Sequence, residues 1–117
     1  MKLSVPILDK KVNNALKDLV REIKKKEKDS IQKIILYGSA ARGEYHWPDS
    51  DVDLFVISDD DGLPEWLLDI EVDVDLKNEV LFASVIRSRI EHEDMVAHKF
   101  SFILNVLEEG KIIYERN

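Results

Sequence analysis

Two short apolar segments flank a polar stretch in the first half of the chain, and this arrangement constrains the fold more than any other feature. The first segment, residues 31–37, is rich in β-branched residues and ends at Gly38-Ser39. The second, residues 51–58, begins with Asp51-Val52-Asp53 and then becomes apolar on both faces. Segments of this length and composition predict buried β-strands. The sequence therefore predicts two strands, one ending in a glycine-serine turn and the other beginning with two carboxylates.

The rest of the chain alternates between helical and strand patterns. Apolar residues at helical spacing predict helices over about residues 9–26, 64–68, 82–92 and 99–109, and Gly110 ends the last of them. Alternating Val and Asp residues predict a third strand over residues 72–76, and residues 112–114 predict an added edge strand. We therefore expect an α+β fold with α/β-type alternation, in which a small mixed β-sheet is flanked by helices.

A chain of 117 residues fits one domain with a modest core. We expect that domain to span residues 1–117, with an N-terminal helix at about 9–26, a core at about 31–93, and a C-terminal helix and tail at about 94–117. No apolar run approaches the roughly 20 residues that cross a bilayer, and the start of the chain lacks a signal peptide pattern. With no cysteine, disulfides and zinc-thiolate sites are excluded. These features predict a cytoplasmic protein that has no membrane partner.

The charge balance bears on the partners of the chain. The net charge is −7, whereas binding a long nucleic acid usually needs a basic face. The one basic cluster contains Lys24, Lys25, Lys26 and Lys28 and is predicted to be the end of a helix, where lysines face the negative pole. A long nucleic acid is therefore not an expected partner.

The carboxylate pair predicts a metal site. Asp51 and Asp53 are two residues apart on a predicted strand, so both side chains point the same way, about 6.5 Å apart along the backbone. Two such carboxylates repel each other unless a cation lies between them, and Mg²⁺ prefers oxygen ligands. On spacing alone, two exposed aspartates that protect the start of a strand are the favoured alternative, because the Asp-x-Asp pattern is common.

The glycine-serine turn predicts a phosphate site. Gly38 lets the backbone approach a ligand closely, because it has no side chain. Ser39 can begin a short helix whose free N–H groups suit a phosphate. Arg42 follows three residues later on the same face and can bind the same anion. The alternative is an ordinary turn with Arg42 in solvent.

Taken together, these motifs resemble the signature of the DNA polymerase β-like nucleotidyltransferase superfamily. The residues that carry the resemblance are Gly38-Ser39, residues 41–44, residues 48–50 and Asp51-Val52-Asp53. More narrowly, the chain is similar to the minimal nucleotidyltransferases (MNT) of prokaryotes, which are encoded beside a partner with a HEPN domain. The resemblance is strongest over residues 31–58 and weakest over 94–117.

The resemblance implies the site and its cofactors. ATP would be the substrate, two Mg²⁺ ions would be bound by Asp51 and Asp53, and Gly38, Ser39 and Arg42 would bind the triphosphate. A third carboxylate, with catalytic and metal roles, would come from the next strand. Asp75 is our choice for it, and Asp73 remains the alternative because both lie on the same face of the predicted strand over residues 72–76.

The resemblance also implies a function and a partner. The expected reaction moves AMP from ATP to a hydroxyl of a HEPN ribonuclease toxin, which makes the chain an antitoxin. The alternatives are a non-catalytic antitoxin that masks its partner, and a transferase with a small-molecule or RNA acceptor. A chain this short with all its elements in the core has no room for a domain that holds the acceptor. The sequence leaves base preference open, as well as a homo- or hetero-oligomeric state.

Overall fold

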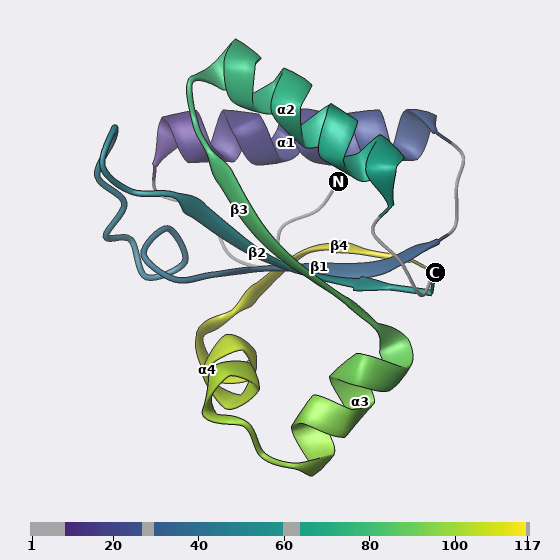
Figure 1. The fold of residues 1–117 in the computed structure, drawn as a ribbon. Helices are drawn as coiled ribbons and strands as arrows, with labels where there is room; N and C mark the ends of the chain where they lie inside the picture. Colours follow the sequence, from purple (N-terminus) through teal and green to yellow (C-terminus); the bar gives the residue numbers. More distant parts are fainter. Residues whose placement is uncertain (1–8, 27–29, 60–63, 117) are drawn as a thin grey trace.

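The computed structural model describes residues 9–26, 30–59 and 64–116. A four-stranded sheet lies between two pairs of helices (Figure 1). The helices α1 (Lys10–Lys25) and α2 (Glu65–Asn78) cover one face, and α3 (Arg89–Ala97) and α4 (Ser101–Glu109) lie on the other. The expected α+β architecture, with helices flanking a small mixed sheet, is confirmed.

The sheet is mixed and has the strand order β3-β2-β1-β4. Its strands are β1 (Ile31–Tyr37), β2 (Val52–Ser58), β3 (Phe82–Ser88) and β4 (Lys111–Glu115). The central strand β1 is antiparallel to both of its neighbours, β2 and β4, whereas β2 and β3 are parallel. Parallel neighbours require a crossover connection, and α2 provides it. The end of β1 and the beginnings of β2 and β3 therefore meet at one edge of the sheet.

The helix α1 forms as its sequence predicts. The Asp9 carboxylate caps its first turn by accepting the Val12 N–H at 2.9 Å. Lys24 and Lys25 lie in its last turn, where their charge suits the helix dipole, while Lys28 lies outside the described residues. The buried face consists of Val12, Ala15, Leu16, Leu19, Val20 and Ile23. No helix in the described ranges has the length and apolar character needed to cross a membrane.

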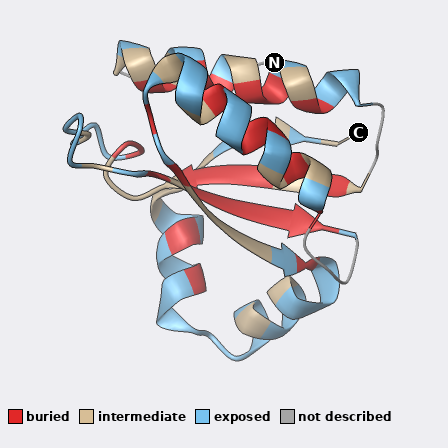
Figure 2. Ribbon diagram, turned by 45° about the horizontal axis from the view of Figure 1, so that its top comes forward, coloured by how far each residue is buried: buried red, intermediate tan, exposed pale blue. Residues whose placement is uncertain are grey.

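The sheet divides the core into two parts. Alternate residues of β2, such as Val52 and Leu54, pack into the larger cluster beneath α1 and α2. Phe55 points to the opposite face and packs with Ile103 and Val106 of α4. Figure 2 shows that the central strands are buried, whereas much of α3 and α4 is exposed. Residues of odd number near the start of β2 therefore point toward the α3–α4 side of the sheet.

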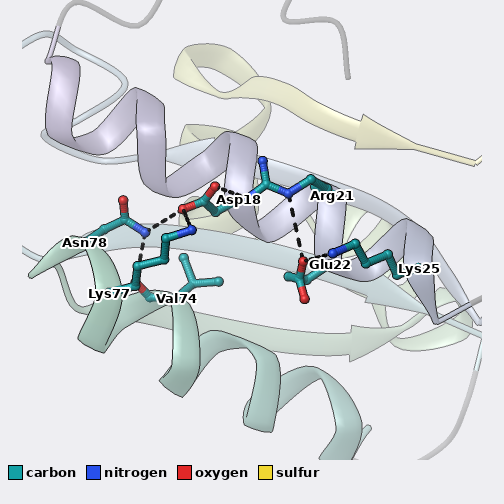
Figure 3. Close-up of polar contacts among 7 residues, drawn as sticks. All are labelled: Asp18, Arg21, Glu22, Lys25, Val74, Lys77 and Asn78. Atoms are coloured by element: carbon teal, nitrogen blue, oxygen red, sulfur yellow. Dashed lines mark hydrogen bonds and ion pairs between the residues drawn. The ribbon is translucent and has the colours of Figure 1, made fainter.

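Polar contacts join α1 to α2 above the larger cluster (Figure 3). Asp18 of α1 accepts a hydrogen bond from the Asn78 side chain at 2.9 Å and lies 3.5 Å from the Lys77 ammonium group. Asn78 also donates to the Val74 carbonyl at 3.1 Å. Arg21 approaches the Asp18 carboxylate from within α1. These contacts hold the end of α2 against the middle of α1.

The predicted strand over residues 72–76 is wrong, because these residues belong to α2. The alternation of Val and Asp there matches a strand locally. However, the buried positions Leu67, Ile70, Glu71 and Val74 follow the helical spacing of one face. The short helix predicted near residue 64 therefore continues through the predicted strand and ends at Asn78.

The predicted helix over residues 82–92 is also wrong in its first part, since β3 occupies Phe82–Ser88. A helix does begin at Arg89, and its start is marked by a capping box. The Ser88 hydroxyl accepts the Glu91 N–H at 3.1 Å, and the Glu91 carboxylate accepts the Ser88 N–H at 2.8 Å. The strands at 31–37 and 112–114 and the helix ending before Gly110 are confirmed.

Candidate active site

Gly38 and Asp53 lie against each other at the edge where β1 ends and β2 begins. Tyr37, the last residue of β1, pairs with Asp53 in the antiparallel ladder. Gly38 has a φ of 76°, which side chains other than glycine rarely adopt. A Cβ on Gly38 would lie 2.2 Å from Oδ2 of Asp53. Glycine is therefore required here both for its backbone conformation and for the space that the carboxylate occupies.

Asp51 and Asp53 flank Val52 at the start of β2, and the charge of Asp51 acts on Asp53. Asp53 is the second residue of β2 and is half-buried, whereas Asp51 lies just before the strand and is exposed. Partial burial raises the pKa of Asp53, and the nearby negative charges of Asp51 and Glu109 raise it further, whereas Arg42 lowers it. The pair is thus a site of concentrated negative charge.

The segment after Gly38 forms hydrogen-bonded turns instead of the predicted short helix. The Arg42 N–H donates to the Gly38 carbonyl at 3.1 Å, and the Glu44 N–H donates to the Ser39 carbonyl at 2.8 Å. The Gly38–Arg42 bond has the spacing of a helical turn, so the N–H groups of residues 39–41 precede Arg42, the first donor of the turn. Ser39 is half-buried beside these groups. One helical turn is enough to present free N–H groups to an anion.

Arg42 and the Gly38 N–H share one acceptor, the carboxylate of Glu109 at the end of α4. The Gly38 N–H donates to Glu109 Oε1 at 3.1 Å, and Arg42 Nη1 lies 3.2 Å from both Glu109 oxygens. Arg42 Nε also donates to Glu44 at 2.6 Å. The hydrogen bonds and charges of Glu44 and then Glu109 raise the Arg42 pKa. The two groups predicted to bind a phosphate thus converge on a carboxylate.

The structure does not bring Asp75 to this site. Asp75 lies on α2, and its Oδ1 accepts the Phe82 N–H at 3.0 Å at the start of β3. The adjacent Val74 packs into the core cluster on the face opposite Phe55, and burial raises the pKa of Asp75 to about 6. Asp73 is exposed on the same helix. The residue of β3 beside Asp53 is Ala83, so β3 offers no carboxylate at that position.

The carboxylate pair fits a hard divalent cation. Mg²⁺ is commonly held by one or two carboxylates and completes its coordination with water and substrate phosphates. Asp51 and Asp53 supply two such carboxylates beside a turn with free N–H groups. In the described part of the chain, no group of three or more His, Cys, Asp and Glu side chains is placed to hold a metal. The residues present therefore suit a cation that a bound nucleotide also coordinates.

Two neighbours of the site were not predicted from the sequence. Glu109 lies 71 residues from Gly38 in the chain, and no local pattern links the two. Its only local signal is its place before Gly110, at the end of a helix where an acidic residue is unfavourable. Tyr37 lies beside Asp53, and its pKa is raised by burial and by the Asp53 charge. Both contacts depend on the sheet register and on the position of α4.

Comparisons with known proteins identify the family of the chain. Residues 17–117 match the sequence model of the family described as "Polymerase beta, Nucleotidyltransferase". The chain is 37% identical over 102 residues to "Putative protein adenylyltransferase MJ0604" of Methanocaldococcus jannaschii, covering 86% of this chain and 95% of that protein.

Two solved structures share the fold at low sequence identity. A toxin–antitoxin complex with AMP-PNP superimposes with a TM-score of 0.56 and 20% identity, over 89% of this chain and 73% of that chain. A mutant of the toxin–antitoxin MntA-HpeT also gives 0.56, at 17% identity over 85% and 74%. With the family match spanning most of its length, the chain belongs to the polymerase β nucleotidyltransferase family.

Proposed function

We propose that the chain is a Mg²⁺-dependent protein adenylyltransferase, which moves AMP from ATP to a hydroxyl of a partner protein. The single observation that carries this proposal is the close approach of Gly38 to Asp53, whose carboxylate also feels the charge of Asp51. A nucleoside triphosphate with its divalent cation needs an anion-binding turn and carboxylates together. The relative from Methanocaldococcus jannaschii, named for protein adenylylation, supports the choice of a protein acceptor.

Each residue of the site has a distinct task in this proposal. The Gly38–Arg42 turn binds phosphate oxygens through its N–H groups, through Ser39 and through the Arg42 guanidinium group. Asp51 and Asp53 hold Mg²⁺, which when bound supplies positive charge to the phosphate oxygens. Asp75 is left out of the catalytic and metal set, because among the described residues it forms no group with Asp51 and Asp53 that could hold a metal.

The proposed reaction is a phosphoryl-type substitution at the α-phosphorus of ATP. The oxygen of the acceptor hydroxyl forms a bond to the α-phosphorus, and the bond from that phosphorus to the β-phosphate oxygen breaks. Pyrophosphate leaves, and the hydroxyl proton passes to solvent. The turn and the carboxylate pair contribute by holding the triphosphate in a fixed orientation, which lowers the entropic part of the barrier.

The surface next to the site supports a polypeptide acceptor. Several large apolar side chains are exposed on α4 and just before it, close to Glu109 and the turn. They are Phe100 (51% exposed), Phe102 (38%), Leu104 (44%) and Leu107 (49%). Exposed apolar groups gathered on one element are typical of protein interaction sites. We propose a HEPN-domain toxin as the partner, by analogy with the toxin–antitoxin complexes that share the fold.

The test is an adenylyl-transfer assay with ATP labelled at the α-phosphate, Mg²⁺ and the protein encoded by the neighbouring gene. We expect label on that protein, released pyrophosphate, and a loss of about 100-fold or more in the variants Asp51→Asn and Asp53→Asn. Asp69→Asn is the matched control, because Asp69 is an exposed aspartate of α2 with no assigned role in the site. Full transfer by the Asp51→Asn/Asp53→Asn double variant would refute the proposal. If only RNA or a small molecule became labelled, the acceptor would be of that class and not a protein.

A further inference from the structure

Glu109 places a negative charge where the proposed function places a phosphate. Its carboxylate accepts hydrogen bonds from the Gly38 N–H at 3.1 Å and from Arg42 Nη1 at 3.2 Å. These are the donors that an anionic ligand of the turn would use. A carboxylate and a phosphate oxygen are both anionic acceptors, so the two cannot occupy the same donors at once.

The position of Glu109 is locally unfavourable, so its contacts with the turn are not explained by the helix itself. Glu108 and Glu109 end α4, whose last turn contains no basic residue. Acidic side chains at this end face the negative pole of the helix. Glu109 also raises the pKa of Asp53 by like-charge repulsion. Among the described residues, the hydrogen bonds from the Gly38 N–H and from Arg42 offset the unfavourable charge of Glu109.

The geometry points to Glu109 as an internal competitor for the triphosphate. Its carboxylate occupies the Gly38 N–H and Arg42, and it must leave both when a nucleotide binds. This inference rests on the proposed function only in assigning a triphosphate to the turn. Glu109 thus lowers the affinity of the turn for polyphosphates and favours ligands that offer several anionic oxygens.

Substituting Glu109 is expected to strengthen anion binding. Glu109→Gln removes the competing charge, whereas Glu108→Gln removes the same charge from an exposed neighbour that has no partner among the described residues. Because an exposed ion pair contributes little and its effect on binding is limited to about fivefold, the Kd should fall about three- to fivefold in Glu109→Gln. In Glu108→Gln we expect a change of less than about twofold.

The experiment measures binding of inorganic tripolyphosphate, without metal, by calorimetry in the wild type and both variants. In parallel, the Gly38 amide signal is followed by NMR. We expect it to shift in the wild type on adding tripolyphosphate, and to shift in free Glu109→Gln because its anionic acceptor is lost. Thermal melting of each variant checks that it is folded.

Three results would overturn the inference: equal or weaker tripolyphosphate binding by Glu109→Gln, an equal gain in Glu108→Gln, or no binding by any form. Weaker binding of Mg²⁺–ATP by Glu109→Gln, with unchanged tripolyphosphate binding, would instead make Glu109 a metal ligand. Because no transfer step enters these measurements, their failure is distinguishable from failure of the adenylyl-transfer assay.

Discussion

Gly38→Ala is the substitution whose effect the structure defines most closely. Its Cβ would lie 2.2 Å from Oδ2 of Asp53, whereas ordinary contacts begin at 3.4 Å. The Cγ and Cβ of Asp53 would also be close, at 3.1 and 3.3 Å. Rotation of the carboxylate alone therefore does not relieve the contact, and the Asp53 side chain must move by about 1 Å. A displacement of this size at a reacting centre costs about 100-fold in rate.

The backbone contributes a separate cost to stability, which a second glycine isolates. Gly43 has the same φ of 76° as Gly38 and is exposed. An alanine in this left-handed conformation costs about 1 kcal/mol. Gly43→Ala therefore introduces the same backbone strain as Gly38→Ala but leaves the carboxylate pair in place. For a chain of this length, 1 kcal/mol lowers the Tm by about 4 °C.

The assay compares the initial rate of adenylyl transfer and the Tm of both variants with those of the wild type. We expect both variants to lose several degrees in Tm, while Gly38→Ala alone loses about 100-fold in rate and Gly43→Ala stays within about threefold. Equal rates in the two variants would refute the reasoning, because the loss would then come from backbone strain and not from the displaced Asp53.

Two further predictions concern the carboxylates of α2. Burial raises the Glu71 pKa from 4.5 to about 7. Between these two pH values the folded protein keeps a proton that the unfolded chain loses. The free energy of unfolding therefore falls as pH rises from 4.5 to 7 and is constant above pH 7. In urea unfolding, Glu71→Gln should flatten this slope and be about 1–3 kcal/mol more stable than the wild type at pH 8; equal slopes would contradict this account. Asp75→Asn keeps an acceptor for the Phe82 N–H and should retain transfer within about threefold, whereas Asp75→Ala should lose about 1–2 kcal/mol. A 100-fold loss of transfer in Asp75→Asn would return Asp75 to the active site.

The sequence predicts the parts of the site that are local in the chain. Gly38 and Asp53 are placed by the ends of two strands whose apolar patterns are continuous, and their pairing follows from the register of β1 with β2. Ser39 and Arg42 follow within one turn. Short-range signals of this kind depend on backbone geometry that glycine and strand alternation specify directly.

The third carboxylate could not be placed in this way. Residues 72–76 match both a strand with alternating Val and Asp and a helix, and only the longer spacing from Leu67 to Val74 decides between them. Predicting a strand instead of a helix for this short segment assigns Asp75 to the wrong face. The Ser-x-x-Glu pattern of Ser88 and Glu91 is a local signal for the start of α3, and it corrects the predicted helix over residues 82–92.

The role of Glu109 is beyond any local pattern. Its contact with Gly38 forms only when the sheet is assembled and α4 ends beside the end of β1. At Gly110 an added Cβ would lie 2.2 Å from the Val106 carbonyl, so glycine permits the close turn from α4 into β4. Long-range placement of this kind follows from packing and not from composition.

The most direct test of the account is where a divalent cation binds. Paramagnetic Mn²⁺, added with a non-hydrolysable ATP analogue in place of Mg²⁺, broadens the amide NMR signals of residues near the metal. We predict that the signals of Gly38, Asp51 and Asp53 broaden first, and that Asp51→Asn/Asp53→Asn abolishes the effect. Broadening that begins at the acidic residues of α3, such as Glu91 and Asp94, and persists in the double variant would contradict a metal site at the Gly38 turn.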